Sequence, residues 1–205
     1  MKFVKFLTVL LVLLCAGCTT DADDDDFDAG KVCPVEGMNA YGMPNRGTFV
    51  DERDGRVYKY TTIGNRMWMA ENLQKVIGSR SDLYSLIEAN QSCPVGWHLP
   101  SDDEWNDLID AVGGADSAGV RLKATEGWRP LNRGDDGNGL DVCGFSMIPL
   151  VDDNFEISGF EAKVWTSTPD HAGGYNFKEF TSNETTVFTA SDVSPYTKFV
   201  RCIKD

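Results

Sequence analysis

Short apolar runs separated by turn residues recur along the chain from about residue 48. The first three are rich in β-branched and aromatic side chains and lie at 48–50, 57–63 and 67–69. Asp54-Gly55 and Gly64-Asn65 separate them, a pattern typical of strands joined by hairpins. Further runs of this kind predict C-terminal strands at 163–168, 175–181, 185–189 and 198–203.

A helix with clear start and stop signals is predicted at 102–112. Ser101 and Glu104 have the spacing of a capping box, and Gly113-Gly114 ends the pattern. The apolar residues between them recur at helical spacing on one face: Trp105, Leu108, Ile109 and Val112. Weaker patterns predict a short helix within 83–90 and another at 117–124. Helices in the middle and strands on both sides indicate an α+β fold, with the first and last strands in one sheet.

The N-terminal residues have the pattern of an export signal. Lys2 and Lys5 precede an apolar run from Phe6 to Leu14. A helix of that length spans roughly 14 Å, too short for a hydrocarbon core of about 30 Å, so a signal peptide is expected. The small residues before Cys18 resemble a lipobox, although Cys15 stands where Leu is usual. We expect residues 1–17 to be removed and Cys18 to be lipidated; ordinary secretion with cleavage nearby is the alternative.

Residues 18–47 are expected to form an acidic tether and linker, followed by one domain at 48–205. Six Asp residues lie between positions 21 and 28, and such a block stays extended and hydrated. We interpret this block as a solvated spacer, or as a signal that resembles the surface-export signals of some Gram-negative lipoproteins. Both interpretations can hold together. The rest of the segment is rich in Gly and Pro and poor in apolar periodicity.

Composition argues against some classes of function but does not identify an activity. The 205 residues carry 19 Lys and Arg against 32 Asp and Glu, a formal charge of −13, which argues against a nucleic-acid partner. The two histidines, His98 and His171, leave little for a histidine-based metal site or catalytic triad. The sequence also lacks the P-loop, GxSxG and HExxH motifs.

Six sequence blocks carry a resemblance to a known family. Gly64–Leu73 looks like "IGGQTWMAENL", Cys93–Ser101 with Glu104-Trp105 like "CPxGWHLPSxxEW", Leu122–Trp128 like "LKSTxGW", Gly144–Ser146 like "GFSALP", Trp165–Thr168 like "WSST", and Val200–Asp205 like "VRCVKD". In this order they resemble the Fibrobacter succinogenes major paralogous domain family over about residues 47–205. The resemblance implies a C-type-lectin-like domain, with short antiparallel strands, one or two main helices and long loops. Members are commonly modules of exported bacterial lipoproteins and surface proteins, and their biochemical function is not established.

Four cysteines remain in the expected domain and linker. An even number in an exported chain argues for disulfides, but the count alone allows three pairings. Cys93 and Cys202 both lie inside family blocks, so the resemblance implies that they pair. Cys33 and Cys143 both depart from the family pattern, and their joint presence suggests a second bond. Two free thiols or an intermolecular bond are the alternative for this second pair.

One acidic loop is a weak candidate for calcium. The Gly-rich segment 134–139 and its flank supply hard oxygen ligands of the kind that Ca²⁺ takes: Asp135, Asp136, Asn138 and Asp141. Their spacing does not match an EF-hand, and the EPN triplet of calcium-dependent lectins is absent. A solvated acidic turn is the favoured interpretation, and no cofactor is expected.

The tryptophans and His98 could serve binding or catalysis, or they could be structural. All five tryptophans lie in family blocks: Trp68, Trp97, Trp105, Trp128 and Trp165. Stacking on sugars is one use of such rings, but their apolar contexts favour a place in the core. His98 as a general base has no assignable nucleophile or orienting acid in the sequence, so a hydrogen-bonded structural role is favoured.

These observations together predict a non-enzymatic, lipid-anchored module at the outer-membrane surface of the cell. It would bind a glycan or a protein, or serve in envelope architecture, and would touch the membrane through its lipid alone. One alternative is an enzyme of the formylglycine-generating type, which needs a redox-active cysteine pair near the C-terminus, where Cys202 stands alone. The other is a purely structural envelope lipoprotein.

Overall fold

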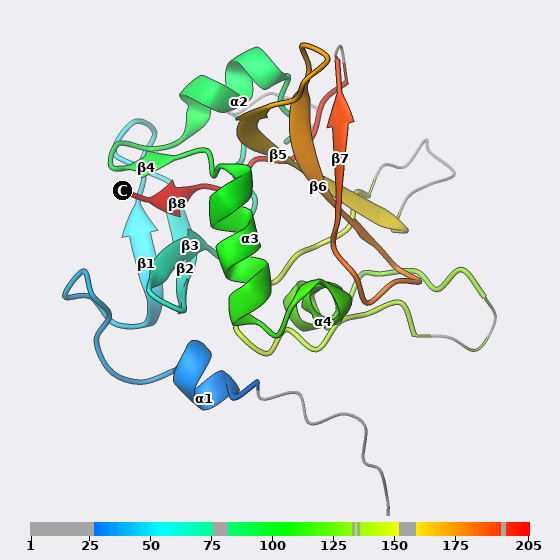
Figure 1. Cartoon of the computed structure of the whole chain (residues 1–205). Coiled ribbons are helices and arrows are strands. Elements are labelled where there is room, and N and C mark those ends of the chain that lie inside the picture. Colours follow the sequence, from blue (N-terminus) through cyan, green and yellow to red (C-terminus); the bar gives the residue numbers. More distant parts are fainter. Residues whose placement is uncertain (1–26, 76–81, 133, 135, 152–158, 194–195) are drawn as a thin grey trace, which may run out of the picture.

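The computed structural model describes residues 27–75, 82–132, 134, 136–151, 159–193 and 196–205. These residues form an α+β fold with two antiparallel sheets and a few short helices (Figure 1). The strands are β1 (Arg46–Val50), β2 (Val57–Ile63), β3 (Arg66–Met69), β4 (Trp97–His98), β5 (Glu161–Pro169), β6 (Tyr175–Thr181), β7 (Phe188–Asp192) and β8 (Ile203–Lys204). The helices are α1 (Ala29–Val32), α2 (Leu86–Ser92), α3 (Asp102–Ala111) and α4 (Ala115–Leu122). Within the described residues, no helix combines the length and apolar character that a membrane span requires.

The first sheet joins the two ends of the described chain. Its strand order is β1-β2-β3-β8-β4, so the expectation that the first and last strands share a sheet is confirmed. The expected hairpins are present, and Gly55 and Gly64 in their turns have φ values of +77° and +60°, which favour glycine. Ile203 of β8 pairs with Trp68 on one side and with His98 on the other.

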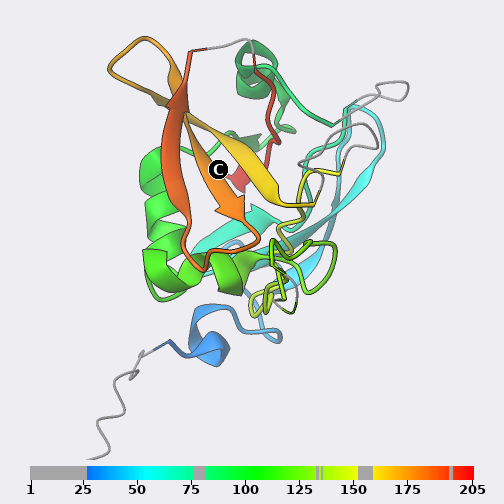
Figure 2. The same ribbon diagram turned by 90° about the vertical axis from the view of Figure 1, so that its right-hand side faces the viewer.

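The second sheet has the order β5-β6-β7 and faces the viewer in Figure 2. Its last strand begins at Phe188, three residues later than expected, and extends to Asp192. The difference arises because residues 185–187 bond to α4 instead of to a strand. The backbone N–H of Val120 donates to the Thr185 carbonyl, and that of Val187 donates to the Ala115 carbonyl.

The segment expected as a single strand at 198–203 crosses from one sheet to the other. Lys198 forms a bridge with Tyr84, and Phe199 forms a parallel bridge with Val164 of β5. A regular ladder with the first sheet begins only at Ile203. The apolar alternation of this segment therefore reflects burial between two sheets, which the sequence pattern cannot distinguish from one continuous strand.

The helix predicted at 102–112 is confirmed as α3. Ser101 Oγ accepts from the Glu104 N–H at 3.3 Å, and Glu104 Oε2 accepts from the Ser101 N–H at 2.9 Å. The expected apolar face is buried in full: Trp105, Leu108, Ile109 and Val112. The weaker helices also exist, shifted by a few residues, as α2 and α4.

Residues 27–47 were expected to be linker, and the structure instead packs them against the domain. Phe27, Ala29 and Val32 contact the main core cluster, and the Val32 carbonyl accepts from the Gly64 N–H at 2.7 Å. Cys33 is bonded to Cys143, which anchors α1. The sequence did not predict this packing. Hydrogen bonds and a disulfide to distant residues hold the segment, and such contacts leave no apolar periodicity in the sequence. The folded unit therefore begins before residue 48.

The core consists of two neighbouring clusters, and the tryptophans lie inside them as expected. Each of the five is at most 8% exposed. Trp105 from α3 contacts rings from both sides of the fold, with centroid separations of 5.0 Å to Trp68, 5.8 Å to Phe145 and 6.4 Å to Phe180. This cluster ties α3 to both sheets.

Candidate binding cleft

A cleft of about 460 Å³ opens beside Arg53. It lies between the turn after β1, the segment after β3 and helix α2. We call it the Arg53 cleft, lined by Asp51, Arg53, Asp54, Leu73, Gln74, Lys75, Tyr84, Glu88, Gln91 and Ser92. A hollow of about 260 Å³, which also touches Asp51 and Arg53, has Phe49 and Trp97 in its wall.

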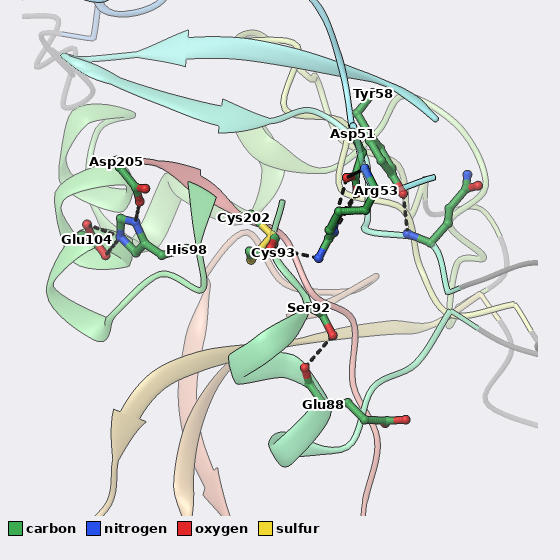
Figure 3. The surroundings of a disulfide bond; sticks show 11 residues. Asp51, Arg53, Tyr58, Glu88, Ser92, Cys93, His98, Glu104, Cys202 and Asp205 are labelled. Atoms are coloured by element: carbon green, nitrogen blue, oxygen red, sulfur yellow. Dashed lines mark hydrogen bonds and ion pairs between the residues drawn. A yellow bond between two sulfur atoms is a disulfide. The ribbon is translucent and has the colours of Figure 1, made fainter. Parts of the chain in front are cut away.

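Arg53 is held in one orientation at the cleft. Its Nε donates to Asp51 Oδ1 at 2.9 Å, its Nη2 donates to Asp51 Oδ2 at 2.7 Å, and its Nη1 donates to the Cys93 carbonyl at 3.1 Å (Figure 3). The hydrogen bonds from Arg53 hold the pKa of the Asp51 carboxyl below its usual range, although burial opposes this. A guanidinium has five N–H bonds, so one on each terminal nitrogen remains without an acceptor among the described residues.

The opposite wall of the cleft carries a second ion pair. Lys75 Nζ lies 3.1 Å from the Glu88 carboxylate, and Glu88 also completes the capping box of α2 with Ser85. Hydrogen bonds from the Ser85 backbone and side chain and from Lys75 lower the pKa of Glu88. Tyr84 supplies an apolar surface, and burial raises the pKa of its hydroxyl. Donors, acceptors and a ring therefore face one cavity.

The disulfide between Cys93 and Cys202 fixes this region to the first sheet. Cys93 ends α2 and Cys202 precedes β8, and Arg53 contacts the carbonyl of Cys93 (Figure 3). The structure thus contains both expected bonds, Cys93–Cys202 and Cys33–Cys143. The first links the wall of the Arg53 cleft to β8, an interior strand of the first sheet.

His98 lies on the other side of this disulfide, between two carboxylates. Its Nδ1 is 2.6 Å from Asp205 Oδ1, and its Nε2 is 3.0 Å from Glu104 Oε1 (Figure 3). Because Glu104 also caps α3, the ring joins the start of this helix to the residue after β8. The hydrogen-bonded role expected for His98 is confirmed, with partners that the sequence alone did not identify.

The charges around His98 predict a pH-dependent stability. Burial opposes protonation of His98, but hydrogen bonds to Asp205 and Glu104 outweigh it and raise its pKa above the ordinary 6.5. Burial also opposes ionisation of Glu104, but hydrogen bonds from Ser101 and His98 lower its pKa below 4.5. The His98 contribution is therefore present below pH 6.5 and lost as the pH rises through the raised pKa. The Glu104 contribution is present above pH 4.5 and lost as the pH falls through the lowered pKa.

We expect His98→Gln to remove the alkaline part of this dependence. The ring is partly exposed, so the effect should stay within about 1 kcal/mol, as for surface ion pairs. Urea unfolding at about pH 5.5 and about pH 8.5 measures it in the wild type and the variant. A wild-type chain that gains stability between these pH values relative to His98→Gln would contradict the assignment.

The described calcium candidates accept hydrogen bonds from within the chain. Asp136 accepts from the Asn138 N–H, Asn138 accepts from the Trp128 N–H, and Asp141 accepts twice from Ser146. The described residues contain no group of three or more His, Cys, Asp or Glu side chains placed to hold a metal. Asp135 and Cys18 lie outside the described residues.

A buried lysine ammonium contacts this loop at the Gly137 carbonyl. Lys123 is buried, and its Nζ donates to the carbonyls of Gly137, Thr181, Ser182 and Glu184 at 3.0–3.4 Å. The loop carbonyls thus surround a cation that belongs to the chain. The sequence did not single out Lys123, because its acceptors lie on loops far along the chain.

The Arg53 cleft was also not predicted from the sequence. Ser85 and Glu88 have the same S-x-x-E spacing as the capping box at Ser101, so that signal was available for α2. Arg53 and Tyr84 have no comparable signal. Their importance depends on the approach of α2 to the β1–β2 turn, which only the tertiary structure brings about.

Comparison with known families gives one match. The family model described as the Fibrobacter succinogenes major domain matches residues 78–204, more than half of the chain. No curated protein and no solved structure matches the sequence.

Proposed function

Because the chain belongs to the Fibrobacter succinogenes major domain family, we propose that it is a non-enzymatic binding module at the bacterial outer-membrane surface. A lipid on Cys18 would anchor it, and the Asp-rich residues that follow would hold the domain away from the membrane. The support for the anchor is the short apolar run that ends in a lipobox-like sequence. No catalytic role is proposed, because His98 contacts two carboxylates and Cys202 lies buried in a disulfide.

We propose a C-type-lectin-like fold for the domain. The support is topological: β8 lies between β3 and β4, so residues from both ends of the domain share a sheet. The Cys93–Cys202 bond ties the segment before α3 to the last strand, as the resemblance implies for such a fold.

The ligand we propose is a glycan bound in the Arg53 cleft. The observation that carries this proposal is the fixed guanidinium of Arg53, which presents two N–H groups beside carboxylates and amides in one concave site. Sugar hydroxyls donate and accept at the same time, so they match a wall on which donors and acceptors alternate. Arg53 is already oriented by Asp51 and Cys93, so binding would order little of its side chain. A cavity with a few positioned polar groups is the usual form of a small-ligand site.

A glycan array with the full chain in detergent micelles tests the proposal. We expect selective binding, which Arg53→Lys weakens by more than about tenfold because the two-pronged geometry is lost. Gln91→Ala removes a cleft amide and should weaken binding about threefold to tenfold, the range for one neutral hydrogen bond. Asn90→Ala is the matched control, since Asn90 is exposed on the same helix and does not line the cleft.

Two results would count against the glycan proposal. An array without binding would reject glycans as the ligand. Binding that all three variants leave unchanged would place the ligand outside the Arg53 cleft.

The anchor has its own test. In Cys18→Ala we expect the protein to leave the membrane fraction and to incorporate no labelled fatty acid. A variant that stays with the membrane would reject Cys18 as the lipidated residue.

A further inference from the structure

A second cleft of about 290 Å³ lies on the other side of Gln74, which lines both cavities. We call it the Arg201 cleft, lined by Lys59, Ala70, Glu71, Asn72, Gln74, Asp82, Ser146, Ile148, Phe199 and Arg201. Three of the family blocks meet here, represented by Asn72, Ser146 and Arg201. Polar residues from distant parts of the chain therefore converge on one small cavity.

Arg201 is a buried cation surrounded by neutral acceptors. Its side chain is fully buried and donates to Asn72 Oδ1, at 3.1 Å from Nε and 2.8 Å from Nη2. Its other acceptors are the carbonyls of Phe145 and Ser146. Arg201 takes part in none of the ion pairs of the described residues. Burial lowers its pKa to about 9, although Asp141 and Glu71 favour the charged form. A buried charge of this kind is stabilised by an anion nearby.

Asn72 has a buried donor without an acceptor. Arg201 can only donate, so the amide oxygen of Asn72 must face it, and this fixes where the amide nitrogen lies. Asn72 is 7% exposed, and its Nδ2 has no partner in the described part of the chain. Unpaired buried donors are rare in native proteins and call for an explanation. The two bonds from Arg201 polarise the amide and make Nδ2 a stronger donor.

We propose that the Arg201 cleft binds the carboxylate of a small ligand, which accepts a hydrogen bond from Asn72 Nδ2 and balances the charge of Arg201. The carboxylates already in the cleft have other partners: Glu71 accepts from the Lys59 N–H and Asp82 accepts from the Lys75 N–H. Lys59 adds an exposed ammonium at the rim, 3.7 Å from Glu71. Because the chain carries a net charge of −13, a ligand with one carboxylate fits better than a polyanion. This site does not depend on the Arg53 cleft.

Three small probes and the full chain in detergent micelles test the proposal. Methyl β-D-glucuronide and methyl β-D-glucoside differ only at the carboxylate, and N-acetylalanine carries a carboxylate without a sugar. We expect saturable binding of the glucuronide, at least about tenfold tighter than that of the glucoside. Binding of N-acetylalanine at similar strength identifies the carboxylate alone as the recognised group, whereas weaker binding identifies an acidic sugar. Wild-type protein that binds neither carboxylate overturns the proposal.

Asn72→Asp separates binding from folding. The carboxylate of Asp keeps an acceptor oxygen for both bonds from Arg201, gives that cation a counter-ion and removes the Nδ2 donor. We expect this variant to unfold at the same or a higher denaturant concentration and to bind the glucuronide at least about tenfold more weakly. Binding equal to wild type would overturn the proposal. The side-chain amide resonances of Asn72 provide a measurement on the unmodified chain, and they should shift with the glucuronide and stay fixed with the glucoside.

Discussion

Replacing Cys93 and Cys202 with Ala will lower the free energy of unfolding by about 4–5 kcal/mol, the chain-entropy value for a loop of roughly 100 residues. The two cysteines are 109 positions apart, and their bond joins the end of α2 to the segment before β8. A domain of this size has a total stability of about 5–15 kcal/mol, so a large share would be lost. Denaturant unfolding of the double variant against wild type measures the change.

The second disulfide is the informative comparison. A bond that only attached a linker to the domain would leave the core folded when removed. In the structure Cys33 and Cys143 are 2% and 0% exposed and belong to the main core cluster. Loss of this bond should therefore also destabilise the whole domain, by a similar amount for its separation of 110 positions.

Unfolding of the two double-cysteine variants tests whether each disulfide stabilises the core, and peptide mapping tests which cysteines pair. A Cys33→Ala/Cys143→Ala variant with wild-type unfolding would mean that residues 27–47 do not stabilise the core. Non-reducing peptide mapping that finds Cys93 joined to Cys143, or Cys33 joined to Cys202, would reject both pairs.

Trp105→Ala will cost about 3–5 kcal/mol of unfolding free energy, as large-to-small changes in a core do. The ring is fully buried and contacts Trp68, Phe145 and Phe180, so its loss would leave a cavity between α3 and both sheets. Ser101→Ala, four residues earlier, removes only the N-cap and should cost about 1 kcal/mol. Urea unfolding of the two variants separates core packing from helix capping on one element.

The ratio of the two losses matters more than either value. Near-zero losses in both variants would mean that α3 is wrongly placed. A loss at Ser101 as large as that at Trp105 would mean that the start of the helix contributes more than the contact of its apolar face with the core.

Local features of the fold were predictable from the sequence. Three such features are the capping box at Ser101, the apolar face of α3 and the turns at Gly55 and Gly64. Each depends on residues within a few positions of one another, so each leaves a recognisable pattern in the sequence. The order of predicted strands and helices indicated the α+β class, and the family blocks indicated the membership that the family match confirms.

Features that depend on distant contacts were missed or misread. Residues 27–47 are held by a disulfide to Cys143 and by a hydrogen bond from the Gly64 N–H. Both partners lie far along the chain, so no local apolar periodicity indicated that this segment is folded. Arg53 becomes part of a cleft only when α2 approaches the β1–β2 turn. The crossing of residues 198–203 between sheets has the same cause, since burial on two sides gives the same apolar pattern as one strand.

The position of β8 between β3 and β4 also constrains when the domain can form. Until Ile203 and Lys204 are available, β3 and β4 have no common neighbour, and Cys202 cannot bond to Cys93. A chain still emerging from a ribosome or a translocation pore therefore cannot complete this sheet, even if its N-terminal hairpins have already formed. Closure of the sheet must wait for β8 and must join residues more than 100 positions apart, and non-local contacts of this kind slow folding.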